Sequence, residues 1–150
     1  DEAVKNGATL HLGGKAVARE GNFFEPTILT GITRDNPVYF EEFFGPVAQI
    51  YVVKNDEEAI QLANDSHYGL GGIVFSGNSA HGKKVAEQIE TGMVFVNSPL
   101  YTLPELPFGG IKRSGYGREM SSIGLKAFVN EKLIVTNDHP DFKNVNGGLF

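Results

Sequence analysis

The sequence predicts an α/β fold in which a mostly parallel sheet is flanked by helices. Runs rich in β-branched and aromatic residues occur at 47–53, 73–75 and 93–97, and this composition is typical of strands. Helical patterns of about ten residues separate these runs. Strands that alternate with helices in this way usually belong to parallel sheets.

The first part of the chain predicts short elements separated by turns. Residues 1–6 are typical of the end of a helix, because Gly7 can take the left-handed conformation that follows a helix C-terminus. We expect a strand at 8–12, extended structure at 23–29 and a turn at 36–37. A helix without its start suggests that the chain begins inside a larger domain.

Two helices are expected between the strands. Asn55 or Asp56 provides an N-cap for the first, which runs to about Asn64. Ser79 caps the second, which runs to about Glu90. Side chains of these types accept hydrogen bonds from the N–H groups that the first turn of a helix leaves unpaired. Both helices have apolar residues at helical spacing, so each should pack one face on the sheet.

The pattern changes after the strand at 93–97. A loop rich in proline and glycine covers 98–118, and a loop this long in a compact domain usually has a function. A short helix follows at about 121–128, starting at either of two adjacent serines. We expect a last strand at 132–136 and a polar tail at 137–150.

Composition excludes several classes of protein. The apolar share is 41%, the charged share is 21% and the net charge is −5, so the chain is globular and has no basic face for nucleic acid or an anionic membrane. It contains no apolar run long enough to span a membrane and no signal-peptide pattern, and we expect a cytoplasmic protein. The sequence has no cysteine, which excludes disulfides, thiolate metal sites and a cysteine nucleophile within this chain.

Residues 41–47, with the sequence EEFFGPV, form the most distinctive stretch. Pro46 lacks an N–H group and belongs at the entrance of the strand that follows, which we expect to be covered on both faces. Glu42 and Phe44 would then lie just outside the end of that strand. A carboxylate there can accept hydrogen bonds from two ribose hydroxyls, and an aromatic face can pack on a planar ring. The alternative is that both glutamates are solvated and that Phe43 and Phe44 belong to the core.

The segment 107–119, with the sequence PFGGIKRSGYGRE, is the second distinctive stretch. Its glycines permit positive φ and close backbone approach, and such a backbone can hold Phe108 rigidly against a ligand. Alternatively, the segment is a structural loop in which Arg118 and Glu119 pair with each other. Both descriptions can hold together.

Other candidate sites are weaker. Residues 77–84 nearly match the phosphate-binding pattern GxxxxGK[ST], but Lys84 stands where a hydroxyl is required. The histidines His11, His67, His81 and His139 lie on different elements without metal-ligand spacing. We therefore predict surface or capping roles for the histidines and no metal site.

The two distinctive stretches, in this order, resemble the aldehyde dehydrogenase superfamily. The segments 64–70 (NDSHYGL) and 94–97 (VFVN) are similar to that family as well. The resemblance covers roughly residues 1–137. Within it, the segment 103–110 resembles the branch that oxidises succinate semialdehyde.

The resemblance implies a chemistry and a set of site residues. In this family a cysteine thiolate attacks the aldehyde, hydride passes to a nicotinamide, and water hydrolyses the thioester to the acid. The cofactor would be NAD or NADP, and the substrate would be a small-molecule aldehyde, with succinate semialdehyde expected. The resemblance assigns Glu42 to the nicotinamide ribose and Phe44 to the nicotinamide end. It assigns Phe108 to the aldehyde tunnel and Thr102 to the hydroxyl that helps to hold the distal carboxylate.

The resemblance also implies that essential parts lie elsewhere. The nucleotide-binding domain, the general-base glutamate and the catalytic cysteine of the family precede the region present here, so we expect no catalytic residue in this chain. Residues 1–130 would be the C-terminal part of the catalytic domain. Residues 131–150 would hold the strand through which the protein forms a homo-oligomer, followed by the tail. Two alternatives are a weak nucleotide-binding module and a non-catalytic assembly fragment.

Overall fold

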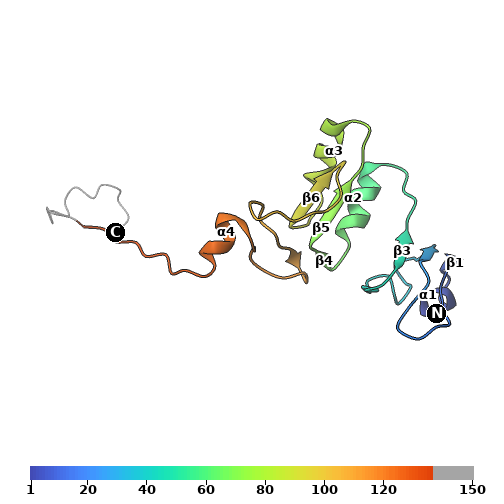
Figure 1. The fold of residues 1–150 in the computed structure, drawn as a ribbon. Coiled ribbons are helices and arrows are strands. Elements are labelled where there is room, and N and C mark those ends of the chain that lie inside the picture. The colour runs from blue at the N-terminus through green and yellow to red at the C-terminus, as the bar shows by residue number, and fades with distance from the viewer. Residues whose placement is uncertain (137–150) are drawn as a thin grey trace.

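The computed structural model describes residues 1–136 (Figure 1). The predicted polar tail at 137–150 lies outside the described residues. Strands and helices alternate along much of the described chain, so the predicted α/β class is confirmed. The strands, however, form three small sheets instead of one.

The first sheet contains β1 (Thr9–Leu12), β2 (Thr27–Thr30) and β3 (Val47–Ile50), in that order. The strand β1 pairs antiparallel with β2, and β2 pairs parallel with β3. The helix α1 (Glu2–Lys5) precedes this sheet and is followed by the C-cap Asn6 and by Gly7, which has the predicted left-handed conformation with a φ of 99°. A small core of five buried side chains joins the helix to the sheet: Ala3, Ala8, Leu29, Ile32 and Val38.

The second group has the helix–strand alternation that the sequence predicts. It contains α2 (Asp56–Asn64), β4 (Tyr68–Gly69), β5 (Gly71–Val74), α3 (Ser79–Ala86) and β6 (Met93–Val96). The strands β5 and β6 pair in parallel along their whole length, and α3 packs against both. Gly82 of α3 lies so close to the strands that an added Cβ would come within 2.8 Å of the Val96 side chain. This glycine permits the close packing of helix on sheet.

The strand predicted at 47–53 is shorter than expected. The strand β3 ends at Ile50, which pairs with Thr30, the last residue of β2. Residues beyond Ile50 have no neighbouring strand in this sheet to bond to. The prediction that both faces of this strand are covered is wrong for this chain, because the side chains of Ile50 and Val52 are 45% and 94% exposed.

One helix cap is confirmed and the other differs. The side chain of Asn55 accepts a hydrogen bond from Glu58 N, as expected for the cap of α2. The cap of α3 is Asn78 and not Ser79, because Asn78 Oδ1 accepts from Ala80 N at 2.9 Å and from His81 N at 3.2 Å. The helix α3 also ends earlier than Glu90, whose N–H donates to Asn64 Oδ1.

The C-terminal part is more structured in its loop and less structured at its end than predicted. The long loop contains β7 (Ile111–Lys112), which pairs antiparallel with β4. The short helix α4 (Ser121–Lys126) is confirmed. Residues 132–136 are not a strand in the structure, because no other segment of the described chain pairs with them. Their apolar side chains at 133–135 are exposed.

Many large apolar side chains in the described part of the chain are exposed, and no side chain in that part is completely buried. They include Leu10 and Leu12 of β1 and, after α4, the side chains at 128–129 and 133–135. No helix among residues 1–136 is long and apolar enough to cross a membrane.

Candidate functional site

The segment that leads into residues 41–47 is anchored by one buried side chain. Asn36 is 3% exposed, and its Nδ2 donates to Ala3 O at 3.0 Å and to Asn6 O at 3.1 Å. Its Oδ1 accepts from Val38 N. The turn predicted at 36–37 therefore has a second role, which is to fix the approach to the motif against α1.

The two adjacent phenylalanines of the motif point in different directions. Phe43 is half-buried and packs against the small core. Phe44 is 91% exposed, and its backbone has a φ of 47°. The left-handed region is unfavourable for a bulky residue and is found mainly where surrounding structure or function requires it. The alternative that both rings belong to the core is therefore wrong for Phe44.

Glu42 and Phe44 share a cavity. This cavity has a volume of about 960 Å³ and is also lined by Gln49 of β3, by Tyr51 just beyond that strand and by the apolar side of α2. A second cavity of about 490 Å³ lies on the other side of the motif and is lined by Phe43, Phe44 and the strands of the first sheet. Glu41 and Glu42 are both exposed. Within residues 1–136 neither side chain joins an ion pair or a hydrogen bond, so the Glu42 carboxylate is available as an acceptor.

The loop that carries Thr102 begins at a tightly held residue. Asn97 ends β6 with a φ of 53°, and its side chain accepts from Ser76 N at 2.7 Å and donates to Ser76 O at 2.8 Å. This pair of bonds joins the ends of β5 and β6. Beyond it Tyr101 packs edge-on against Phe95, while Thr102 is exposed.

Phe108 is held by its backbone. Its N–H donates to Glu119 O at 2.9 Å, and Glu119 N donates to Phe108 O at 2.6 Å. Arg118 does not pair with Glu119, because its Nη1 donates instead to the carbonyl oxygens of Gly110 and Gly117. The following glycine, Gly109, has a φ of 156°. Phe108 is thus half-buried on a rigid turn, as the glycine-rich sequence predicts.

The structure does not bring the four predicted site residues into one cavity. Neither cavity beside Glu42 and Phe44 is lined by Thr102 or Phe108. The first pair lies at the entrance of β3, and the second pair lies in the loop after β6. An active site that uses all four residues needs further elements to close the space between them.

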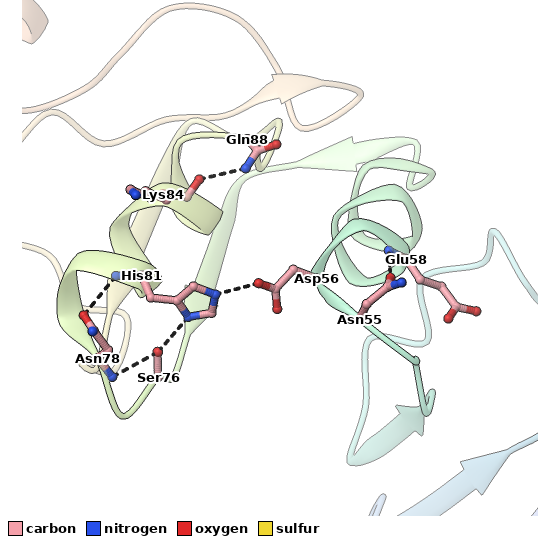
Figure 2. Close-up of polar contacts among 8 residues, drawn as sticks. All are labelled: Asn55, Asp56, Glu58, Ser76, Asn78, His81, Lys84 and Gln88. Carbon is pink, nitrogen blue, oxygen red and sulfur yellow. Dashed lines mark hydrogen bonds and ion pairs between the residues drawn. The ribbon is translucent and has the colours of Figure 1, made fainter.

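Of the four histidines, His11 and His81 are exposed, as predicted, and His67 is half-buried. The contacts of these three could not be predicted from the sequence, and His139 lies outside the described residues. Figure 2 shows His81 pointing between two neighbours, with Nε2 at 2.5 Å from Asp56 Oδ2 and Nδ1 at 3.1 Å from Ser76 Oγ. This chain of contacts ties the first turn of α2 to the first turn of α3. No group of histidines and carboxylates within residues 1–136 could hold a metal ion.

Two groups near the motif have shifted pKa values. Burial and the hydrogen bond from its hydroxyl to Asp65 raise the pKa of Tyr39 above 10.0. Burial also raises the pKa of Tyr51. Both phenols therefore stay neutral donors in the folded chain at neutral pH. The contact between Tyr39 and Asp65 could not be predicted from the sequence, since it joins residues far apart in the chain.

Comparison with known proteins finds relatives in one family. The model of the aldehyde dehydrogenase family matches residues 1–134. The chain is 50% identical over 133 residues to a succinate-semialdehyde dehydrogenase [NADP(+)] of Deinococcus radiodurans, and the match covers 89% of this chain and 28% of that protein. The chain thus spans less than a third of the length of this relative.

Solved structures agree with this match. The chain superimposes on succinic semialdehyde dehydrogenase from Streptococcus pyogenes, solved with NADP+, with a TM-score of 0.87 and 58% identity, covering 90% of this chain and 30% of that one. It superimposes on betaine aldehyde dehydrogenase from Staphylococcus aureus, solved with NAD+, with a TM-score of 0.86 and 39% identity, covering 97% and 30%. The family model, the relatives and the fold agree, and the chain belongs to the aldehyde dehydrogenase family.

Proposed function

We propose that this chain supplies part of the active site of an NAD(P)-dependent aldehyde dehydrogenase that oxidises succinate semialdehyde to the acid. In this role Glu42 and Phe44 bind the nicotinamide end of the cofactor, and Thr102 and Phe108 line the aldehyde channel. The observation that carries the proposal is the conformation of Phe44. An exposed aromatic ring on a left-handed backbone, beside an exposed carboxylate, is suited to a ligand and does not serve the core.

The residues present fit one end of a nicotinamide dinucleotide. The Glu42 carboxylate can accept hydrogen bonds from both ribose hydroxyls, and the Phe44 ring offers a face for the adjoining planar ring. When bound, the dinucleotide accepts hydride from the substrate. This chain's contribution is to orient the nicotinamide and to exclude water beside it.

The aldehyde side depends on the loop after β6. Phe108 is fixed by its backbone pairing with Glu119, so its ring can form one wall of a narrow channel. Thr102 is exposed and can donate its hydroxyl hydrogen to a carboxylate at the far end of the substrate. The relatives named for succinate semialdehyde support this substrate class.

The nucleophile must come from another part of the polypeptide or from another chain, because this sequence has no cysteine. Acyl transfer through a thioester requires a thiolate. We therefore infer that the isolated chain oxidises no aldehyde. We also propose that residues 132–136 join the sheet of a second subunit, because they carry an exposed apolar run without a partner strand in the described chain.

A chimera tests the proposal. The matching segment of the Streptococcus pyogenes enzyme is replaced by this chain, and the chimera is assayed with NADP and two aldehydes of equal length. We expect turnover of succinate semialdehyde and a much lower kcat/KM for butanal, which lacks the distal carboxylate. A folded chimera that binds NADP and turns over neither aldehyde would overturn the proposal.

A single substitution tests the substrate assignment separately. Thr102→Val removes the hydroxyl and keeps the branched shape. The substitution should lower kcat/KM for succinate semialdehyde by about tenfold, the cost of losing one hydrogen bond to a charged group. Activity with butanal should stay unchanged. Equal losses with both aldehydes would mean that Thr102 does not contact the carboxylate.

A further inference from the structure

The segment Asn64–Gly69 links two parts of the proposed site and has no role in the function proposed so far. It follows α2 and runs into β4. On one side it contacts the residues that lead into the Glu42 motif. On the other side it contacts the loop that carries Phe108. The first set of contacts is made by side chains, and the second involves backbone as well as side chains.

On the first side, one carboxylate oxygen receives two donors. Asp65 Oδ2 lies 2.6 Å from Arg34 Nη1 and 2.9 Å from the Tyr39 hydroxyl. The Asp65 side chain is 24% exposed, while that of Arg34 is 70% exposed. Hydrogen bonds to a charged, partly buried acceptor are among the stronger ones in proteins. Asp65, at the C-terminal end of α2, therefore holds Tyr39, which lies between β2 and β3 in the sequence.

Next along the chain, His67 holds the residue beside Tyr39. The rings of His67 and Phe40 are stacked, with centroids 4.4 Å apart and an interplanar angle of 7°. The guanidinium of Arg34 lies 5.3 Å from the centroid of the same Phe40 ring. Tyr39 and Phe40 are thus held at two points. They directly precede Glu41 and Glu42, and Glu41 N donates to Val38 O. The position of Tyr39 and Phe40 therefore determines the position of the Glu42 backbone.

The same segment holds the Phe108 loop by its backbone. Arg113 N donates to His67 O at 3.0 Å, and Gly69 N donates to Ser114 Oγ at 3.0 Å. The strand β4 pairs with β7, which starts at Ile111. Lys112 Nζ donates to Asn64 O at 2.8 Å and pairs with Glu90 at 3.1 Å. Residues 111–114 are therefore tied to the residues that hold Tyr39 and Phe40.

We propose that Asp65 and His67 are positioning residues, which set the Glu42 and Phe44 segment relative to the loop of Phe108. The inference rests on the proposed function, since it concerns how the cofactor end and the aldehyde channel of that site are held together. The nicotinamide and the aldehyde must be aligned for hydride transfer, and small misplacements are costly. A rigid link between their two binding segments provides that alignment.

The test uses the chimera with the Streptococcus pyogenes enzyme and the KM for NADP. Asp65→Ala removes the shared acceptor, and Tyr39→Phe removes only one donor. We expect Asp65→Ala to raise the KM for NADP by about tenfold and Tyr39→Phe to raise it by a smaller factor. Asp56→Asn is the matched control, since Asp56 contacts His81 at the opposite end of α2, and it should leave the KM unchanged.

A double-mutant cycle separates positioning from general loss of structure. If Asp65 acts by placing Glu42, the variant Asp65→Ala combined with Glu42→Gln should have a KM for NADP no higher than that of Glu42→Gln alone. Additive effects would show that Asp65 acts independently of Glu42 and would overturn the inference. A wild-type KM for NADP in Asp65→Ala, together with a raised KM in Glu42→Gln, would overturn the positioning role of Asp65 and leave the proposed function standing. Wild-type behaviour of both would overturn the proposed function as well.

Amide exchange in the isolated chain gives a second measurement that does not depend on activity. Asp65→Ala should speed exchange at Glu41 N, whose hydrogen bond to Val38 O belongs to the turn before Glu42. Exchange at Leu29, in the middle of β2, should stay as slow as in the wild type. Unchanged exchange at Glu41 would contradict the proposed positioning role even if the chimera lost activity.

Discussion

Phe44 shows at the residue scale how the chain places an aromatic ring outside its core. Its φ of 47° turns the chain sharply, so that Phe43 enters the core while the next ring leaves it. Because a bulky residue gains nothing from this conformation by itself, the surrounding contacts must impose it. Asn36 fixes the start of the segment, and pairing of Val47 with β2 fixes its end.

Glu42 is the residue whose substitution should matter most for the cofactor. Glu42→Gln keeps the size and removes the charge and one good acceptor for a ribose hydroxyl. In the chimera we expect weaker NADP binding by about 1–3 kcal/mol, the cost of breaking hydrogen bonds to a charged group. Titration of NADP against the protein measures it.

Glu41→Gln is the matched control. Glu41 is exposed, like Glu42, but we expect its carboxylate to contact solvent and not the cofactor. The substitution should therefore change NADP affinity little. Equal effects from the two substitutions would mean that the register of the motif is misassigned.

Tyr39 gives a pH-dependent prediction. Its pKa is raised in the folded state by burial and by the bond to Asp65, so the folded chain holds this proton more tightly than the unfolded chain does. The resulting stability is present below the unfolded pKa of about 10 and is lost as the pH rises through the folded pKa. Urea unfolding between pH 8 and about 11 measures this loss.

Tyr39→Phe cannot lose that proton and should show a smaller decline of unfolding free energy above pH 10 than the wild type. At neutral pH it should be less stable by about 1 kcal/mol, through loss of the hydrogen bond. Tyr51→Phe controls for the second raised phenol. A decline that is the same in wild type and Tyr39→Phe would rule out this contribution.

The sequence located the candidate residues better than it described their surroundings. The motifs around Glu42 and Phe108 could be found because glycine, proline and paired aromatic residues have local meanings. The left-handed backbone of Phe44 could not be predicted, since phenylalanine gives no signal for positive φ. Asp65 and His67 were missed as positioning residues because their partners Tyr39 and Phe40 lie far away in the sequence.

At the scale of elements, α2 and α3 each begin after an asparagine whose side chain bonds to the backbone of the first turn. Asn78 Oδ1 caps α3 by accepting hydrogen bonds from Ala80 N and from His81 N, and Figure 2 shows the second of these. Asn78→Ala should destabilise the chain by about 1 kcal/mol, as is typical for an N-cap. Ser79→Ala should cost much less because Ser79 is already the first helical residue. Thermal or urea unfolding of the pair measures the difference, and a larger loss for Ser79→Ala would contradict the assigned cap.

Residues 132–136 give a prediction about assembly. The isolated chain should self-associate at micromolar concentration, because the apolar side chains at 133–135 are exposed in the described chain and a second chain can bury them. Ile134→Pro removes a ladder donor and should shift the assembly toward monomer. Sedimentation measures both.

Ile134→Val keeps the N–H group and most of the apolar surface, and it should assemble like the wild type. A wild-type chain that sediments only as monomer, with Ile134→Pro indistinguishable from it, would show that this segment does not mediate assembly.

The types of most elements could be predicted, while several of their ends could not. The helix α2 was predicted with its cap, since Asn55 and the acidic first turn are local signals. The strand β3 ends early because β2, its only partner among residues 1–136, ends at Thr30. The pairing of β7 with β4 was missed for another reason: each is a two-residue strand, too short to show the alternation typical of a strand.

At the scale of the whole chain, the three sheets have open edges and exposed apolar faces. Parallel strands such as β5 and β6 normally belong to larger sheets covered on both faces. The relatives are more than three times as long as the segment they share with this chain. The division into three sheets could not be predicted. Alternation of strands and helices indicates the direction of the strands, but it does not specify which strands are neighbours.

The central claim is that this chain carries cofactor and substrate contacts of an aldehyde dehydrogenase but lacks its nucleophile. The most direct test compares the isolated chain with the Streptococcus pyogenes chimera in one assay of NADPH formation from succinate semialdehyde. We predict steady NADPH formation by the chimera and none by the isolated chain above a blank without protein. NADPH formation by the purified isolated chain, or none by a folded chimera that binds NADP, would contradict the claim.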